Sequence, residues 1–271
     1  MTAATEPSRR SPGWAFAAGA VVGVLGGLVG LGGAEFRLPL LIGVFGFAAL
    51  SAVIVNKAMS LIVVIAAIPA RLFAVPVADI AGQWPVVVNL LMGSLVGAWV
   101  GASWATRMRT ATLYRVLALL LVAIAVVFAA SHWRVLPETS LSGAGLFIAG
   151  VLAGFAIGVV AAVMGVAGGE LLIPTITVLY AVDVKLAGSL SLLVSLPTML
   201  VAFFRYSRDQ AFGVLRANPS FVVAMALGSI VGTVVGGALL GVVPSAVIAP
   251  LVVALLLVSA WKVWQHSNDT A

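Results

Sequence analysis

A short glycine-rich motif occurs twice in this chain, and the two copies lie a fixed interval apart. The first copy reads GLGGAEFRLP from Gly30 to Pro39, and the second reads GVAGGELLIP from Gly165 to Pro174, so each position recurs 135 residues later without a gap. The same interval superposes GSLVG at residues 93–97 on GSIVG at residues 228–232. The chain is therefore a duplication, and its fold must be one that two copies of the same unit can build together.

The composition places both copies in a membrane. Of the 271 residues, 63% are apolar and 8% are charged, and the mean hydropathy is +1.23, which exceeds what a water-soluble core needs. Stretches near or above the roughly 18 to 20 residues that cross a bilayer lie at residues 14–29, 54–70, 86–105, 113–130, 143–164, 186–204, 221–240 and 246–261. Two shorter apolar stretches, residues 38–50 and 171–182, follow the motifs. We therefore predict an all-α polytopic membrane protein.

Several classes of function are not expected. The net charge of +6 is spread between the apolar stretches and not gathered into a stripe, so no nucleic-acid partner is predicted. The chain has no cysteine, and its two histidines, His132 and His266, lie outside the predicted spans. We therefore expect no disulfide, no metal centre and no cofactor. An intramembrane enzyme is not expected either, because no His, Cys or Ser–Lys constellation supports one.

Basic residues predict the orientation. They gather before the first span, in the connection after residues 86–105, and in the connection after residues 186–204. These groups are Arg9 and Arg10; Arg107, Arg109 and Arg115; and Arg205, Arg208 and Arg216. All three should be cytoplasmic, which leaves the connections with Asp79 and Glu138 on the outside. Arg9 and Arg10 before an apolar run also resemble a signal sequence, but that run matches residues 155–163 of the second copy, so we expect it to stay as an anchored span.

This orientation is consistent only if each motif region enters and leaves the membrane on the same side. Each repeat then makes a hairpin plus three crossings, and the second repeat is inverted. The second arms, at roughly 12 or 13 residues and about 18 to 20 Å of helix, fall short of the roughly 30 Å hydrocarbon core. We favour a broken or re-entrant helical hairpin, although two full crossings stay open, with six to ten spans in all. The predicted parts are a cytoplasmic tail (1–13), two membrane repeats (14–131 and 143–262) and a second cytoplasmic tail (263–271).

The motif glycines predict where the helices break. Glycine lets the backbone leave helical geometry and approach a ligand closely, and the six positions are Gly30, Gly32, Gly33, Gly165, Gly168 and Gly169. Pro39 and Pro174 are tolerated best in the first turn of a new helix, so we expect them to mark the helix breaks. The N–H groups freed at such a helix start favour an anion. The glycines at residues 93, 97, 101, 228, 232 and 236 are instead spaced for helix packing.

Each motif also carries a carboxylate, Glu35 in the first copy and Glu170 in the second. An ionised carboxylate within the bilayer costs about 2.5 kcal/mol or more, so such residues usually face a cavity and have a function. We predict that Glu35 and Glu170 take up and release protons. The alternative is that each carboxylate caps the N–H groups of its own short helix.

Three polar positions break the symmetry. Arg37 stands where the second copy has Leu172, and Asn56 and Lys57 stand where it has Ser191 and Leu192. The guanidinium fork of arginine suits an oxyanion, but Arg37 could also pair with Glu35 or extend to the membrane interface. Lys57 could simply lie near the membrane surface. Ser60 and Ser195 are equivalent positions in the next helix and could line the same cavity.

The doubled Gly-x-Gly-Gly-x-Glu-x-x-x-Pro pattern, on a chain of this length and hydropathy, resembles the TauE/SafE sulfite exporter family over about residues 14–262. Ala34 and Ala167 depart from that pattern, where glycine would be typical. The resemblance implies an inner-membrane permease for sulfur-containing anions such as sulfite, sulfoacetate or other organosulfonates.

We therefore expect a secondary transporter, in the export direction, that is driven by an ion gradient, with protons as the coupling ion. The candidate substrate-binding residues are the six motif glycines, Arg37, Asn56, Lys57, Ser60, Ser191 and Ser195. The partners are a small anion and the lipid bilayer. Alternatives are a transporter or channel for another solute, including a cation held by Glu35 and Glu170, and a purely structural subunit.

Overall fold

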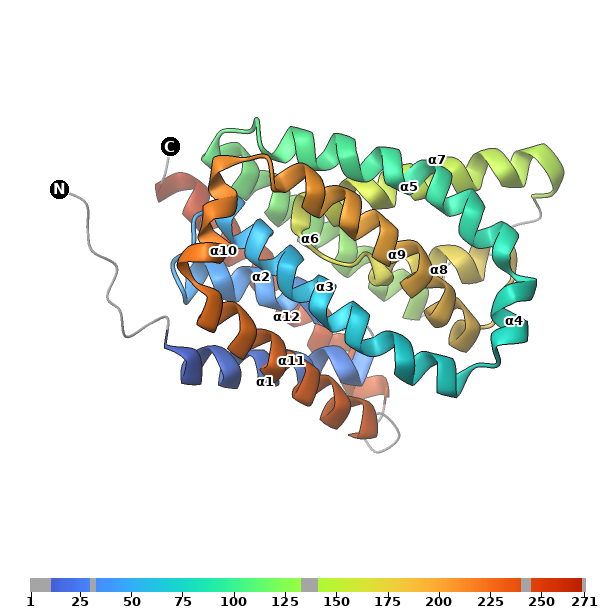
Figure 1. The fold of residues 1–271 in the computed structure, drawn as a ribbon, viewed down its shortest axis with the longest axis horizontal. Helices are drawn as coiled ribbons and strands as arrows, with labels where there is room; N and C mark the ends of the chain where they lie inside the picture. The colour runs from blue at the N-terminus through green and yellow to red at the C-terminus, as the bar shows by residue number, and fades with distance from the viewer. Residues whose placement is uncertain (1–10, 30–32, 133–140, 240–244, 270–271) are drawn as a thin grey trace.

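The described residues form a bundle of helices and contain no strand (Figure 1). The computed structural model describes residues 11–29, 33–132, 141–239 and 245–269. The first repeat contributes α1 (Pro12–Val29), α2 (Ala34–Gly43), α3 (Ala49–Ala74), α4 (Val77–Gly82), α5 (Trp84–Ala105) and α6 (Thr110–His132). The second contributes α7 (Gly143–Met164), α8 (Gly169–Tyr180), α9 (Val184–Tyr206), the 3-10 turn η2 (Gln210–Phe212), α10 (Gly213–Ala217), α11 (Pro219–Leu239) and α12 (Ser245–Asp269).

Six helices in the described part of the chain are long and apolar enough to cross a membrane, namely α3, α5, α6, α7, α9 and α11. Helices α1 and α8 are apolar but shorter. The prediction of an all-α polytopic membrane protein is confirmed.

The helix boundaries follow the duplication. Helices α2, α3, α5 and α6 begin at residues 34, 49, 84 and 110, and α8, α9, α11 and α12 begin at residues 169, 184, 219 and 245. Every pair is separated by the 135 residues that separate the two motifs. The helix contacts also exchange between the repeats: α1 packs along α11, α7 packs along α5, and α6 packs against α12. The two repeats are therefore interlocked, and neither forms a separate bundle.

Glycine stripes make this interlocking close. A Cβ atom on Gly23 of α1 would overlap a backbone carbonyl oxygen of α11, and one on Gly97 of α5 would overlap a backbone carbonyl oxygen of α7. The same holds for the reciprocal glycines Gly228, Gly232 and Gly236 against α1. The prediction that these glycines pack helices together is confirmed.

Equivalent helices of the two repeats run in opposite directions. Helices α1 and α11 run from the end of the bundle that carries α10 toward the end that carries α4, whereas α5 and α7 run back (Figure 1). This is the arrangement that an inverted repeat requires, and the inversion relative to a membrane stays a prediction. The connection with Arg107 and Arg109 lies at the α10 end, and Asp79 lies in α4 at the other end.

The first hairpin arm is shorter than its apolar stretch indicates. The prediction of one arm over residues 38–50 is wrong, because α2 ends at Gly43 and α3 begins at Ala49. Gly46 has φ 65°, a left-handed backbone that ends the helix locally. The rings of Phe45 and Phe47 lie 4.9 and 5.3 Å from the ring of Phe221, so the apolar residues of the turn are buried by packing and not by helix formation.

Candidate functional site

Both motifs interrupt helices at left-handed glycines. Gly33 (φ 72°) and Gly168 (φ 87°) precede the first residues of α2 and α8, and Gly165 (φ 71°) ends α7. A Cβ on Gly165 would overlap the carbonyl oxygen of Val53 in α3, so α3 packs directly against the break between α7 and α8. Gly169 is the first residue of α8, and no described atom lies within 4 Å of the place of its Cβ. Gly30 and Gly32 lie outside the described residues.

The prolines do not mark the breaks. Pro39 and Pro174 are each the sixth residue of their helix, so the prediction that they lie in the first turn is wrong. A proline has no N–H to donate to the carbonyl four residues earlier. In both helices that carbonyl belongs to the motif glutamate, so the backbone oxygens of Glu35 and Glu170 receive no helical hydrogen bond from this position.

The two motif carboxyl groups meet in the interior. Glu35 and Glu170 are the second residues of α2 and α8, and they are only 1% and 3% exposed. Each side chain interacts with the other. Among the described residues, no group donates a hydrogen bond to any of their four carboxyl oxygens. Neither helix has a side-chain cap, so the capping alternative lacks the hydrogen bond that it needs.

Arg37 is fully buried next to this pair and does not extend to the membrane interface. Its Nε donates to Oδ1 of Asn56 at 2.8 Å, and its Nη2 donates to Oγ of Ser60 at 2.8 Å. Its Nη1 donates to Oγ of Ser229 at 3.1 Å. The guanidinium is thus held flat by three neutral oxygens, and one of them comes from α11 of the other repeat.

Lys57 is also fully buried, so the alternative that it lies near the membrane surface is wrong. Helix α3 begins at Ala49, which places Lys57 two turns inside it. Its Nζ donates to the carbonyl oxygens of Ala161 (2.8 Å) and Val166 (2.6 Å) at the end of α7. A cation at a helix C-terminus is favourable, because carbonyl groups there lack helical partners.

Asn56 connects the two breaks. Its Nδ2 donates to the carbonyl oxygens of Ala34 in α2 (3.0 Å) and Met164 in α7 (3.3 Å). Ser60 donates to the carbonyl oxygen of Gly165 at 3.4 Å. Consecutive turns of α3 therefore hold the start of α2 and the end of α7 in place.

The other two predicted serines do not join this network. Ser191 donates to Gly188 of its own helix at 2.8 Å. The hydroxyl of Ser195 is buried and has no hydrogen-bond partner among the described residues.

Two residues of the network were not predicted from the sequence. Ser229 holds Arg37, and the hydroxyl of Tyr206 donates to the carbonyl of Ala162 at 2.9 Å. A signal for Ser229 exists, because it aligns with Ser94 within the duplicated GSxxG segment and is fully buried. No comparable signal marks Tyr206.

The buried side chains form a group of four charges. Glu35 interacts electrostatically with Arg37, and Glu170 with Lys57. With all four groups ionised, the formal charge of the group is zero. No cluster of three or more His, Cys, Asp or Glu side chains that could hold a metal occurs in the described ranges.

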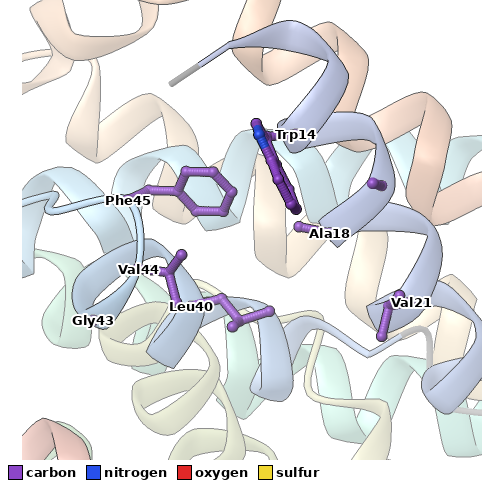
Figure 2. Close-up of a pocket in the computed structure, with 8 residues that line it drawn as sticks. Trp14, Ala18, Val21, Leu40, Gly43, Val44 and Phe45 are labelled. Carbon is purple, nitrogen blue, oxygen red and sulfur yellow. The ribbon is translucent and has the colours of Figure 1, made fainter. Parts of the chain in front are cut away.

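A separate cavity of about 730 Å³ lies between α1 and the end of α2. Its lining includes Trp14, Val21, Leu40, Val44 and Phe45, and every lining residue is apolar or glycine (Figure 2). Trp14 is 69% exposed and Val44 is 49% exposed. This cavity offers no polar side chain to a charged solute, so it is not the candidate site.

Comparison with known proteins agrees with the first repeat. Residues 2–128 match the family model described as sulfite exporter TauE/SafE. No curated protein and no solved structure matches the chain significantly. The family is one of membrane transporters for sulfite-like anions, and the resemblance predicted from the doubled motif is thereby confirmed. Through residues 2–128 the chain is assigned to the TauE/SafE family of sulfite exporters.

Proposed function

We propose that this protein is a secondary transporter that exports a small sulfur-containing anion, such as sulfite, sulfoacetate or another organosulfonate, in exchange for or together with protons. The family match supports a transporter of sulfite-like anions. The observation that carries the coupling is the pair of buried carboxyl groups, Glu35 and Glu170, which lack hydrogen-bond donors among the described residues. The proposed location is the inner membrane, with both chain ends in the cytoplasm.

Charge balance gives a physical reason for the coupling. Two cations, Arg37 and Lys57, are buried with two carboxyl groups, so the site is neutral when all four are ionised. A proton on the carboxyl pair leaves one unit of uncompensated positive charge. Because an unbalanced buried charge is costly, the site then favours one negative charge from a ligand. Loss of the proton restores the carboxylate, which repels the anion.

Donors for the anion are present at the same place. The described bonds of Arg37 use three of its five N–H groups, and those of Lys57 use two of its three. The starts of α2 and α8 add backbone N–H groups that carry partial positive charge. The open space at Gly169 leaves the start of α8 accessible to a ligand. The other candidate residues, Asn56 and Ser60, position Arg37 and the helix breaks in this proposal.

A second candidate function is transport of a cation. Pro39 and Pro174 free the carbonyl oxygens of Glu35 and Glu170 from helical hydrogen bonds. Two carboxylates with two free carbonyl oxygens would form an all-oxygen site, which hard cations prefer. The neighbouring Arg37 and Lys57 oppose this function by repulsion.

The test is flux in proteoliposomes that contain purified protein. Radiolabelled sulfite or sulfoacetate is loaded, and its efflux is measured with and without an imposed pH gradient. Glu35→Gln and Glu170→Gln mimic the protonated carboxyl group, so each should lose acceleration by the gradient, while anion exchange survives in at least one variant. Asp79→Asn removes an exposed carboxylate of α4 and should behave as the unmodified protein.

Two outcomes would contradict the proposal. If both Gln variants keep full gradient-driven flux, the carboxyl groups do not couple protons to transport. If a monovalent cation and not the anion accumulates, and both variants abolish it, the cation function is correct.

A further inference from the structure

An aromatic and basic cluster covers the outer face where α5 meets α9, away from the four buried charges. We call it the Arg205 cluster, and it consists of Trp99, Ser103, Thr106, Phe204, Arg205 and Arg208. The ring centroids of Trp99 and Phe204 are 6.5 Å apart, and the two side chains are 40% and 55% exposed. Such exposure of large aromatic rings is typical of side chains that face lipid at the membrane–water interface.

The two guanidinium groups are held in place over these rings. Cζ of Arg208 lies 4.6 Å from the ring centroid of Phe204 and 5.6 Å from that of Trp99. Nε of Arg205 donates to Oγ of Ser103 at 2.7 Å, and its Nη2 donates to Oγ1 of Thr106 at 3.3 Å. These contacts fix the orientation of both forks and leave N–H groups free to bind an anion.

The positive charge of the cluster is uncompensated. Within the described ranges neither arginine forms an ion pair, and the hydroxyl partners of Arg205 are neutral. The adjacent carboxylate, Asp209, instead accepts a hydrogen bond from the backbone N–H of Ala211 at 2.9 Å. Arg107 and Arg109 add exposed charge at the same end of the bundle.

The cluster occurs in only one of the two repeats. The positions 135 residues away from Trp99, Arg205 and Arg208 are Val234, Ala70 and Phe73, which are all apolar. The positions that correspond to Ser103 and Thr106 are Ala238 and Gly241. In an inverted repeat these positions would lie at the opposite membrane surface. The cluster is therefore not a requirement of the shared fold, and it adds a property to one leaflet only.

We propose that the Arg205 cluster binds the phosphate headgroup of an anionic glycerophospholipid in the cytoplasmic leaflet. Two guanidinium forks match the oxygens of a phosphodiester. Leu200, one turn before Phe204, and Val96, just before Trp99, are 48% and 56% exposed, so they extend the same surface toward the hydrocarbon core and can contact the acyl chains. A free phosphate would gain nothing from these apolar residues, which is why the proposal names a lipid.

The test measures binding of defined lipids to the purified full-length protein in a neutral detergent. Phosphatidylglycerol and phosphatidylcholine with identical acyl chains are compared by native mass spectrometry and by the shift of the thermal midpoint. Inorganic phosphate and glycerol phosphate serve as the headgroup without chains. We expect phosphatidylglycerol to bind about tenfold more tightly than phosphatidylcholine, since one charged hydrogen bond contributes about that factor.

The variant Arg205→Gln with Arg208→Gln should lose this preference, and Arg208→Gln alone, which removes no described hydrogen bond, should reduce it with the fold intact. The matched control is Arg109→Gln with Arg216→Gln, which removes the same charge at the same end and should keep the preference. Equal loss in the control would show a diffuse charge effect and overturn the site. Equal binding of both lipids, or full competition by inorganic phosphate, would also overturn it.

Discussion

The substitution Lys57→Met tests whether the buried lysine holds the break between α7 and α8. Methionine has a similar length and no charge, so it fills the volume but cannot donate. The bonds to the carbonyl oxygens of Ala161 and Val166 are both lost. Ala161 keeps the N–H of Val166 at 3.1 Å as a donor, whereas Val166 retains no described donor to its carbonyl oxygen.

The size of the effect follows from these bonds. One charged hydrogen bond contributes about 1.5 to 3 kcal/mol, and leaving a buried carbonyl oxygen unsatisfied costs about 1 to 3 kcal/mol. The neighbouring Glu170 also loses its cation, and breaking a buried ionic group costs about 3 to 5 kcal/mol in total. We therefore expect a loss of about 3 to 5 kcal/mol. At roughly 2 to 4 °C per kcal/mol, the thermal midpoint should fall by about 6 to 20 °C.

The assay is thermal denaturation of purified protein in one detergent, followed by loss of the monodisperse species. The control is Lys262→Met, which removes an exposed lysine of α12 and should shift the midpoint by no more than about 2 °C. A Lys57→Met midpoint within about 2 °C of the unmodified protein would refute the structural role. The lysine would then be free to act on the substrate alone.

Two further predictions address the breaks and the topology. Gly165→Ala should destabilise the protein by about 2 to 5 kcal/mol in the same assay, because alanine is strained at φ 71° and its Cβ overlaps Val53, whereas Gly169→Ala, which meets no described atom, should be neutral. Equal effects would contradict the described breaks. In this cysteine-free chain, single cysteines at Arg109 and at Gln210 should react with an impermeant thiol reagent from the cytoplasmic side only, and one at Asp79 from the other side only. Labelling of Arg109→Cys and Gln210→Cys from opposite sides would contradict the inverted repeat.

The local features of the fold could be predicted from the sequence. Long apolar stretches set the helices, and the repeat interval set their equivalence. The helix breaks followed from the glycines, because Gly33, Gly165 and Gly168 need a left-handed backbone that other residues rarely adopt. The end of α2 could not be predicted, because residues 38–50 are apolar throughout and hydropathy does not distinguish a packed turn from a helix.

The partners of the charged residues could not be predicted either. Arg37 was expected to face an anion, Glu35 or the membrane interface, and its actual partners include Ser229, which is 192 residues away. Lys57 binds carbonyl groups more than 100 residues away, at a helix end that sequence alone does not place beside α3. Such contacts depend on how the two repeats interlock, and an apolar pattern carries no information about that docking. By contrast, the meeting of Glu35 and Glu170 followed from symmetry, since equivalent positions near a pseudo-twofold axis lie close together.

The asymmetry of the two motifs has an electrostatic reason. The duplication supplies two carboxyl groups, one from each repeat, but both buried cations come from the first repeat, where the second has Leu172 and Leu192. A fully symmetric site would bury four cations with two carboxylates and carry two uncompensated charges, which is costly in a low-dielectric interior. With one set of cations the site is neutral, and a single proton is enough to change its sign. Arg37, Asn56 and Lys57 all donate to α7, α11 or the α7–α8 break of the second repeat, so the residues that break the symmetry also join the repeats. The protonation state of the carboxyl pair therefore acts on the same contacts that hold the two repeats together, which links charge at the site to the relative position of the repeats.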